Sequence, residues 1–415
     1  MREKIKLGIG FATGRKNFRN VLNSYIYSFN ESKGNENVEL YLFVAYDVEY
    51  HETKSTDYTN LNQEVTDSLA GIIFFGAKNA QQSVMRLINE EIVPEKETKN
   101  IFGKGYAGKR NAILYGAIDA GMDYLLFLDD DEYPVAVTKT GDTCLWSGQE
   151  VVTEHIKQIK DADITNGHHC GYISPIPKIN FNETLKEQDF AKFIGAISND
   201  ILNWDKVKNL MESGGVTYGD TEILSKKIKK EVEEINGCKF ISGSNLCINL
   251  RKPKRTFPFY NPPGARGEDT FLSTMLEDRT VIKVPCYTFH DGFDAYKHLL
   301  DGVLPRELGS ISAKSEHIVK RFYQACIGWV RYKPLLMYLT NPKEFHQKSK
   351  EIQEALDQVS PKLSQYFDEK GFLEIPNQFK KYQKNAERHS QNFEKNRATW
   401  QLLMEDLIAK NKNQE

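Results

Sequence analysis

The sequence predicts an α/β protein whose central, mostly parallel sheet is flanked by helices and followed by an α-helical C-terminal region. The chain opens with a strand, a helix and a second strand between Ile5 and Tyr46, the order that starts a parallel sheet. A run of five apolar residues, Tyr124 to Leu128, is typical of a strand buried on both faces. From Ser310 onward the pattern is helical and richly charged, so we expect one domain over residues 1–309 and a helical domain over 310–415.

The composition is that of an ordinary globular protein and argues against several other classes. Of the 415 residues, 40% are apolar and 27% are charged, and the formal net charge of −2 gives no bulk attraction for nucleic acid. No run reaches the ~18 apolar residues that a membrane span needs. The six cysteines are scattered without a Cys-x-x-Cys pair, which favours reduced thiols. Because the chain runs directly into a strand pattern, we expect no signal peptide and a cytoplasmic protein.

The first elements alternate as a parallel sheet requires. In order, they are a strand from Ile5 to Ala12, a helix from Phe18 to Phe29, strands from Glu39 to Tyr46 and from Gly71 to Phe75, and a helix from Gln81 to Ile92. Thr13 and Asp47 directly follow the first two strands. From the position of Asp47 a carboxylate often reaches a ribose or a base, and a simple turn residue is the alternative.

A glycine-rich segment, Gly103 to Gly108, leads into a helix that we expect to end at Gly121. Lys109 and Arg110 lie in its first turns, where cations oppose the helix dipole. An anionic ligand nearby would offset that opposition, and a solvated basic turn is the alternative. The glycines alone do not make a dinucleotide site, because no strand directly precedes them.

Four acidic residues, Asp129, Asp130, Asp131 and Glu132, follow the buried strand without a gap. A strand of this kind delivers the residues at its carboxyl end to the edge of the sheet where open α/β folds bind ligands. Adjacent carboxylates repel one another, and a divalent cation held by their oxygens would relieve the repulsion. A solvated acidic loop is the alternative.

The remaining elements of the first domain follow the same alternation. They are helices from Ser147 to Lys160 and Glu187 to Met211, strands from Asp163 to Ser174 and Lys239 to Leu250, a helix from Glu268 to about Met275, and a strand from Thr280 to Phe289. We interpret His168, His169 and Cys170 as mostly structural, because side chains on a strand alternate and cannot all face one ion. Glu268 and Asp269 lie at a helix start, where the dipole favours carboxylates and where capping is the alternative role.

Taken together, these residues resemble the nucleotide-sugar-dependent glycosyltransferases of the GT-A fold, closest to family 2. The most specific part is the run from Gly108-Lys-Arg-Asn-Ala to Asp131; the Gly-Glu-Asp helix start and the strand that ends at His290 add to it. The resemblance covers Ile5 to Phe293, and its polar loop after Asp47 is longer than usual. No Gln-x-x-Arg-Trp signature of processive polymer synthases is present.

The resemblance implies a GT-A (Rossmann-like) domain that transfers a sugar from a UDP-sugar to a glycan or glycoconjugate hydroxyl, with inversion. It implies roles for the residues as follows: Mn²⁺ or Mg²⁺ held by Asp129, Asp131 and His290, the nucleotide sugar bound by Thr13, Asp47, Lys109, Arg110, Asp129 and Asp130, and catalysis by Asp269 with Glu268. We expect Glu268 to cap its helix, which leaves Asp269 freer to act as the base. Without the resemblance, His290 would be structural more often than not.

Three rival functions remain open at this point. A sugar nucleotidyltransferase would need a basic glycine-rich loop after the first strand. The segment Thr13 to Lys16 meets this requirement only in part. A non-catalytic carbohydrate-binding protein could keep the same fold. A haloacid-dehalogenase phosphatase also uses Asp-x-Asp, but after its first strand, whereas here the motif follows about the fourth.

The helical domain has amphipathic faces that need a partner, so we expect it to serve acceptor choice, assembly into a homo-oligomer, or contact with a membrane surface. Trp329, Arg331, Tyr332 and Lys333 are the candidates for a peripheral contact at the inner face of the membrane. A buried contact between helices is the use that we favour for these residues.

Overall fold

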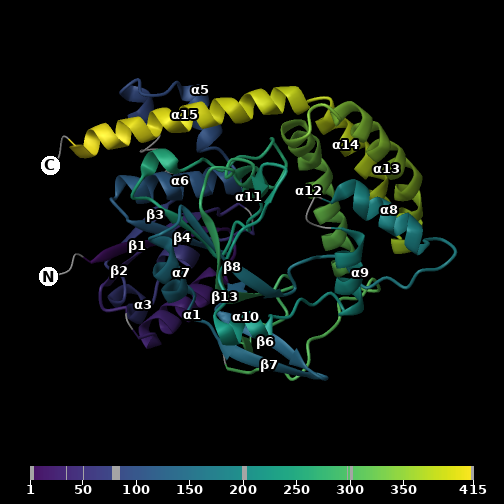
Figure 1. Ribbon diagram of the computed structural model, residues 1–415, viewed down its shortest axis with the longest axis horizontal. Helices are drawn as coiled ribbons and strands as arrows, with labels where there is room; N and C mark the ends of the chain where they lie inside the picture. Colours follow the sequence, from purple (N-terminus) through teal and green to yellow (C-terminus); the bar gives the residue numbers. More distant parts are fainter. Residues whose placement is uncertain are drawn as a thin grey trace.

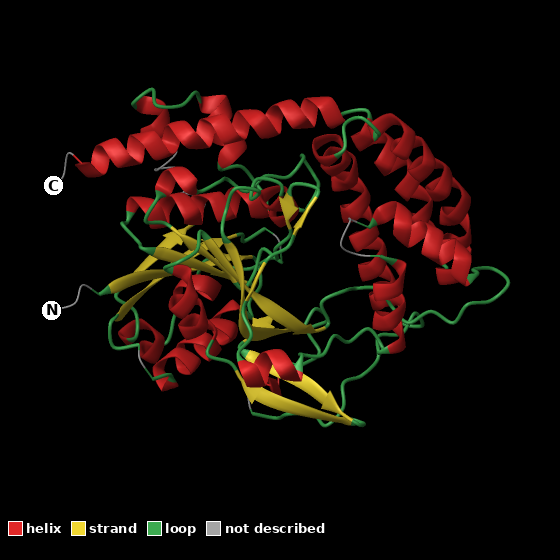
Figure 2. Cartoon of the chain, viewed as in Figure 1, coloured by secondary structure: helices red, strands yellow, loops and turns green. Residues whose placement is uncertain are grey.

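The computed structural model describes residues 4–33, 35–49, 51–76, 85–198, 203–296, 298–299 and 302–412. A twisted sheet with helices on both faces occupies one half of the molecule, and a group of long helices occupies the other (Figure 1). Figure 2 shows the separation clearly, because every long strand lies in the first half. The last helix then returns across the first half of the molecule (Figure 1).

The described residues contain a sheet of nine strands. Eight of them lie in the order β3-β2-β1-β4-β12-β8-β13-β5, and β9 pairs with β13. Their bounds are β1 Ile5–Thr13, β2 Val38–Tyr46, β3 Gly71–Phe75, β4 Tyr124–Leu128, β5 Glu132–Tyr133, β8 Ile164–Gly171, β9 Lys230–Glu231, β12 Leu246–Asn249 and β13 Val281–His290.

The sheet is mostly parallel, as the sequence predicts. β1 is parallel to β2 and β4, β2 is parallel to β3, and β8 is parallel to β13. β12 lies between β4 and β8 and is antiparallel to both, so β8 and β13 run in the same direction as β4. The residues that end β1, β2, β4, β8 and β13 therefore arrive at one edge of the sheet, which we call the acidic edge because Asp129 to Glu132 lie there.

Helices cover both faces of the sheet because successive side chains of each strand point to opposite sides. On one face, Phe127 belongs to a buried cluster with apolar residues of α6, Tyr106–Asp119. On the other face, its neighbour Leu126 is buried with residues of α1, Phe18–Glu31. All five residues of β4 are buried, which confirms the prediction of a strand covered on both sides.

The predicted helix from Ser147 to Lys160 is shorter than expected. α7 spans Val151–Ile159, because the preceding residues form an antiparallel hairpin of β6, Val135–Thr140, and β7, Thr143–Gly148. The sequence pattern did not indicate this hairpin. The predicted strand from Asp163 to Ser174 is confirmed as β8.

The predicted strand from Lys239 to Leu250 is broken into two short pieces. β11, Cys238–Lys239, pairs with β10, Glu234–Ile235, and only the last residues join the large sheet as β12. Between the two pieces, Asn245 has a left-handed backbone conformation with φ of 50°, which is incompatible with a continuous strand. The resulting turn over residues 242–245 enters the site described below.

The predicted helix from Glu187 to Met211 is two helices, α8, Glu187–Ile197, and α9, Trp204–Glu212. The second begins where the Asn203 side chain accepts a hydrogen bond from the backbone of Lys206, an N-cap that starts a new helix. Of the predicted helix from Gln81 to Ile92, residues 85–89 are helical and 81–84 lie outside the described residues. Shorter elements are α2 Thr56–Thr59, α3 Gln63–Asp67, α5 Glu95–Ile101, α10 Thr221–Lys226, α11 Glu268–Ser273, η1 Pro253–Arg255 and η3 Lys370–Glu374.

The region after Ser310 is helical, as predicted. Its long helices are α12 Glu316–Thr340, α13 Phe345–Phe367, α14 Ile375–Gln383 and α15 Ala386–Lys412. α12, α13 and α14 pack with α8 around a separate apolar cluster that includes Phe190, Phe322 and Phe379. Tyr332 and Lys333 are buried, which confirms a helix contact for this part of α12.

The last helix, α15, packs against the sheet half of the molecule. Trp400 is fully buried in the same cluster as Phe127, and its indole nitrogen donates a hydrogen bond to Thr256 Oγ1 at 3.0 Å. Ion pairs flank this contact, including Arg86 with Asp406 at 2.9 Å. The division of the chain at residue 309 stays a prediction, and the two parts share one apolar core through α15.

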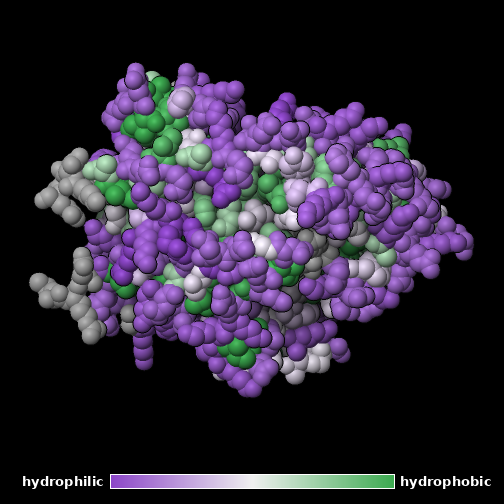
Figure 3. All heavy atoms as spheres, turned by 45° about the horizontal axis from the view of Figure 1, so that its top comes forward, coloured by the Kyte–Doolittle hydropathy of each residue, from purple (hydrophilic) through white to green (hydrophobic). Residues whose placement is uncertain are grey.

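The surface offers no membrane-spanning element within the described residues, where no helix combines the necessary length and apolarity. The face shown in Figure 3 is largely hydrophilic, and its hydrophobic patches are small and separate. All six cysteines are buried, and none of them forms a disulfide bond.

Candidate active site

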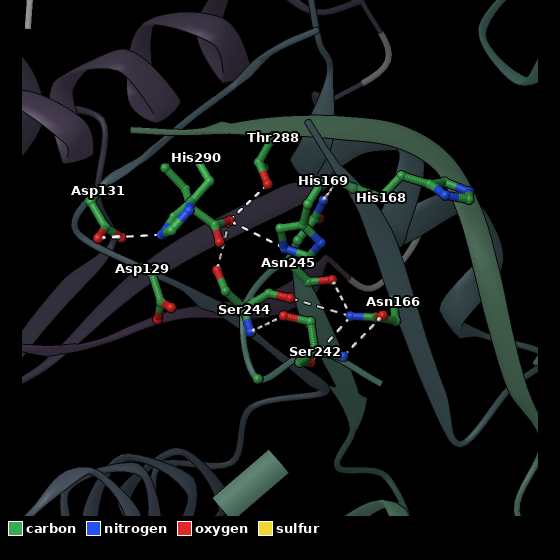
Figure 4. A network of polar contacts seen from close by, with 12 residues as sticks. Asp129, Asp131, Asn166, His168, His169, Ser242, Ser244, Asn245, Thr288 and His290 are labelled. Carbon is green, nitrogen blue, oxygen red and sulfur yellow. Dashed lines mark hydrogen bonds and ion pairs between the residues drawn. The ribbon is translucent and has the colours of Figure 1, made fainter. Parts of the chain in front are cut away.

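Asp131 and His290 meet at the acidic edge, one after β4 and the other at the end of β13 (Figure 4). His290 Nε2 lies 3.4 Å from Asp131 Oδ2. The other ring nitrogen, Nδ1, donates to the Tyr172 carbonyl oxygen at 2.6 Å, which fixes the ring so that Nε2 faces the carboxylate. Burial by itself would lower the pKa of His290, but Asp131 raises it to about 9.

Arg15, in the turn after β1, supplies the positive charge of this group. Its Nη1 contacts Asp131 Oδ2 and lies 3.2 Å from Asp130 Oδ1. Burial would raise the pKa of Asp131, but His290 and Arg15 outweigh it and hold this pKa well below its usual range. Asp131 is therefore a carboxylate with two cationic neighbours.

Asp130 points into the protein. It is only 5% exposed, and its Oδ2 accepts a hydrogen bond of 2.6 Å from the hydroxyl of Thr13, which is itself buried. Burial raises the pKa of Asp130. In this structure Thr13 and Asp130 join β1 to the loop after β4, and their predicted contact with a nucleotide sugar stays a prediction.

Asp129 faces away from Asp131 (Figure 4). Its Oδ1 lies 2.9 Å from Arg110 Nη2, with which it forms an ion pair. Arg110 is 3% exposed, donates through Nη1 to the Gly243 carbonyl oxygen, and lies over the ring of Phe127 at 5.2 Å. Burial raises the pKa of Asp129 to about 7 in spite of Arg110. Arg110 thus holds the loop after β4, and its predicted contact with a nucleotide remains a prediction.

Glu268 and Asp269 reach the same edge from the first turn of α11. Glu268 Oε1 lies 3.7 Å from Arg110 Nε, so one arginine contacts both this turn and Asp129. Asp269 accepts hydrogen bonds from the backbone N–H of Gly243 at 3.2 Å and from that of Thr270 at 2.8 Å. Burial, together with Asp269, raises the pKa of Glu268.

Glu268 is the first residue of α11 and follows Gly267, which has a left-handed conformation with φ of 97°. The Glu268 side chain lies near Arg110, whose buried guanidinium needs a counter-charge, while Asp269 accepts the hydrogen bond from the first-turn N–H of Thr270. The capping role expected for Glu268 stays a prediction.

Asp47 and Lys109 form the remaining predicted pair. Lys109 Nζ lies 2.8 Å from Asp47 Oδ2 and joins the end of β2 to the first turn of α6. Burial would raise the pKa of Asp47, but the hydrogen bond from Lys109 lowers it. Both side chains keep some exposure, 33% for Asp47 and 18% for Lys109, so the pair stands at the surface beside the acidic group.

A second layer under Asp131 and His290 was missed from the sequence. Glu132 is 4% exposed and accepts hydrogen bonds from Thr288 at 2.7 Å and from Ser244 at 2.9 Å. His169 Nε2 lies 3.4 Å from the same carboxylate (Figure 4). Burial would raise the pKa of Glu132, but the neighbouring His169 lowers it. His169 thus lies beside the candidate site, and its mostly structural interpretation stays a prediction.

Strand alternation contained a signal for His169. Parallel β8 and β13 set His169 beside Thr288 and set His168 beside Tyr287. His168 stacks on Tyr287, with ring centroids 4.9 Å apart, on the opposite face. Since Thr288 and His290 are two residues apart on β13, His169 lies on the same face of the sheet as His290. Strand alternation therefore favoured His169 over His168 as a candidate site residue.

Asp131 and His290 could hold a divalent cation as a pair. This pair fits the structure better than the predicted triad of Asp129, Asp131 and His290. No group of three His, Cys, Asp or Glu residues that could hold a metal ion exists among the residues described. Mg²⁺ and related ions are commonly bound through one or two protein ligands plus substrate phosphates and water. The carbonyl that fixes His290 Nδ1 is also the usual outer partner of a metal-binding histidine.

The helical C-terminal region holds the loop that leads into the two acids of α11. Over residues 262–267, Tyr382 Oη donates to the Pro263 carbonyl oxygen at 2.6 Å, and Arg331 Nη1 donates to the next carbonyl at 2.8 Å. The Tyr332 ring lies against the last glycine of the loop, where an added Cβ would approach it to 3.0 Å. The position of Glu268 and Asp269 therefore depends on α12 and α14.

No protein-family model matches this sequence, and no curated protein matches it. The structure is similar to crystal structures of S. aureus TarS residues 1–349, over 92% of this chain and 92% of that one. The TM-score is 0.35 at 8% sequence identity for one of them, 0.37 at 9% for the complex with UDP-GlcNAc, and 0.36 at 11% for the complex with UDP. At this low similarity, the function proposed below rests on the residues of this chain.

Proposed function

We propose that this protein is a glycosyltransferase that moves a sugar from a nucleotide-diphosphate donor, a UDP-sugar, to a hydroxyl group of a glycan or glycoconjugate. One observation supports it above the others. Arg110 contacts Asp129 at 2.9 Å and Glu268 at 3.7 Å, so the acids after β4 and the acids in the first turn of α11 lie side by side. A transferase needs this proximity, because the leaving diphosphate and the attacking hydroxyl meet at one carbon atom.

The donor side of the site would be formed by the residues after β1, β2 and β4. A bound Mn²⁺ or Mg²⁺ would act as a Lewis acid toward the diphosphate leaving group, and Asp131 and His290 would hold it, with Asp129 as the third predicted ligand. Asp47 and Lys109 border this group and would contact the nucleoside. The role of each is a proposal that follows from its position at the acidic edge.

The acceptor side would be formed by the first turn of α11. Asp269 would take the proton from the acceptor hydroxyl, and inversion of the anomeric centre follows if that hydroxyl attacks from the side opposite the diphosphate. The backbone N–H groups of Gly243 and Thr270 hold its carboxylate in one orientation. Glu268, which is tied to Arg110, would assist by keeping the loop in place. The C-terminal helices would serve acceptor choice, assembly or membrane contact.

The test is a panel of nucleotide sugars incubated with the full chain and Mn²⁺ or Mg²⁺, with and without candidate glycan acceptors. Release of the nucleoside diphosphate together with sugar transfer supports the proposal. Release of pyrophosphate from a nucleoside triphosphate and a sugar phosphate would instead identify a nucleotidyltransferase. Binding in a thermal-shift assay without turnover would identify a binding protein, since a ligand at 100 times its Kd stabilises by about 2.7 kcal/mol.

A further inference from the structure

Arg15 stands where a cation shared by Asp131 and His290 would have to bind. Its Nη1 contacts Asp131 Oδ2, the same oxygen that lies 3.4 Å from His290 Nε2, and it reaches Asp130 as well. Its side chain is 31% exposed, and the Arg15 backbone N–H lies 3.3 Å from Thr13 Oγ1. The guanidinium therefore lies at the open side of the acidic group, on a backbone that is anchored independently.

We propose that Arg15 is an exchangeable counter-ion: in the donor-free protein it occupies the cation position at Asp131 and His290, and it moves onto the diphosphate of the donor when a divalent cation takes that position. The proposal rests on the proposed function, and it adds a donor-binding residue and a coupling between cation and donor. Neither the motif run nor the acids themselves indicated this role for Arg15.

Electrostatics supports the exchange. A divalent cation on Asp131 Oδ2 would lie at contact distance from the guanidinium, and two positive charges this close repel strongly where solvent is partly excluded. The guanidinium fork matches the oxygens of a phosphate, and a diphosphate beside the cation offers such oxygens. Arg15 thus loses one anionic partner and gains another in the same step, so it is never left unpaired.

The exchange couples the two ligands. Without the donor, a cation must displace Arg15 with no compensating partner, so the protein alone should bind Mn²⁺ weakly. With the donor, displacement of Arg15 adds a diphosphate contact, so each ligand should raise the affinity of the other by the same factor. A permanent structural ion pair would predict no such dependence on Arg15.

The test measures Mn²⁺ binding by electron paramagnetic resonance, from the loss of the free-ion signal, for the full chain without and with UDP. Arg15→Gln should bind Mn²⁺ without UDP about tenfold more tightly than the wild type, equivalent to about 1.4 kcal/mol. In the same variant, UDP should raise Mn²⁺ affinity by a smaller factor than in the wild type. Arg15→Lys, which keeps the charge, should stay close to the wild type in Mn²⁺ affinity without UDP.

Arg255→Gln is the matched control, because Arg255 pairs with Asp163 at 2.6 Å at the start of β8, at the opposite edge of the sheet. It should leave both Mn²⁺ affinities unchanged. Equal Mn²⁺ affinity of Arg15→Gln and the wild type, with thermal melting confirming that both are folded, would overturn the exchange. If Arg15→Gln does not fold, equal coupling by UDP in Arg15→Lys and in Arg15→Ala would overturn it.

Failure of the proposed function gives a different result. If calorimetry shows no binding of UDP or UDP-sugars to the wild type, with or without Mn²⁺, then the donor assignment is wrong. If UDP binds but Mn²⁺ does not bind to any variant, the donor assignment stands and the exchange is excluded.

Discussion

The acidic edge of the sheet and the face covered by α15 are built in opposite ways. At the edge, four consecutive acids are packed with two arginines and two histidines, several of them nearly without solvent contact. Under α15, Trp400 and its apolar neighbours form the contact, and charged pairs lie only around it. Burial of apolar area stabilises a fold, whereas buried charges contribute little or cost free energy. The α15 face therefore contributes stability, whereas the charges of the edge have little stabilising value and fit the proposed role in binding and chemistry.

Removal of the Asp131 carboxylate should have the largest effect on activity. In Asp131→Asn, sugar transfer should fall by about 10³-fold or more, the loss expected for a main electrostatic group of an active site. The wild type in excess EDTA should lose activity to a similar extent and recover it with Mn²⁺. Because the substitution leaves Arg15 and His290 without their shared counter-charge, stability should fall as well, so activity is compared at a temperature where circular dichroism shows both proteins folded. Full transfer activity in excess chelator would contradict a metal role at this edge.

Substitution of the predicted base should affect the rate and not the donor. Asp269→Asn should lower kcat by about 10²–10⁴-fold, the usual contribution of a general base. The Kd for UDP, measured by calorimetry, should stay the same, because Asp269 is held by Gly243 and Thr270 and not by the residues after β4. NMR of the wild-type product should show an inverted anomeric centre. A near-normal kcat in the variant, or a retained anomer, would exclude this role.

Substitutions on the α15 face should lower stability and leave donor binding unchanged. Trp400→Ala removes a fully buried side chain, so the free energy of unfolding in guanidinium chloride should fall by about 3–5 kcal/mol. Leu402→Ala, two residues away and 50% exposed, should cost less than about 0.5 kcal/mol. Below its melting temperature, Trp400→Ala should keep the donor Kd of the wild type. Equal stability of the two variants would remove the contrast between the regions.

His155 should make the stability of the fold depend on pH in the mildly acidic range. It is completely buried on α7 between Thr165 Oγ1 at 2.7 Å and Asn245 Oδ1 at 2.8 Å, and burial lowers its pKa to about 4, with Lys283 adding to the effect. The unfolded chain takes up this proton near pH 6.5, so His155 should lower stability as the pH falls from about 6.5 to 4, and not above that range. Urea unfolding across this range should show a smaller slope with pH in His155→Gln than in the wild type.

The smallest effect should come from the contact between the two regions. Tyr382→Phe removes the hydrogen bond to Pro263 in the loop before Glu268, which should cost about 1 kcal/mol of stability. If this bond positions the acids, kcat should also fall several-fold with an unchanged KM for the donor. Tyr366→Phe removes two bonds, one donated to the Asn180 carbonyl oxygen at 2.9 Å and one accepted from the Asn180 N–H at 3.1 Å, and should lower stability alone. The same kcat in both variants would show that the loop does not depend on α14.

The parts of the fold that were predictable from sequence are those set by local patterns. The apolar run Tyr124 to Leu128 predicted a buried strand, and the alternation of elements predicted a mostly parallel sheet. From these, the meeting of Asp131 with His290 followed, since strand ends of one direction share an edge. The break of the predicted strand before Leu246 was not predictable, because it depends on the backbone of Asn245 and on contacts distant in sequence.

Only those features of the site that follow from a residue's position at the end of a strand could be predicted from the sequence. Asp129 and Arg110 were both singled out, but their pairing and the near-complete burial of Arg110 depend on the Gly243 turn, 133 residues further along the chain. Arg15 was interpreted only as part of a short basic turn, because the residues next to it in the sequence do not show that it reaches the acids after β4. Charge partners selected by tertiary packing leave no local signal.

The return of α15 to the first half of the molecule has a consequence for folding during synthesis. Arg86 bonds with Asp406 across 320 residues, and Trp400 bonds with Thr256 across 144. A growing chain must complete its sheet and then wait for these late residues before the apolar surface beside α5 and η1, on which α15 packs, is covered. Such distant contacts slow folding and leave intermediates whose exposed apolar surface makes them prone to aggregate. Translation speed over the last helix, and chaperones that shield the open face, should therefore govern the yield of native protein.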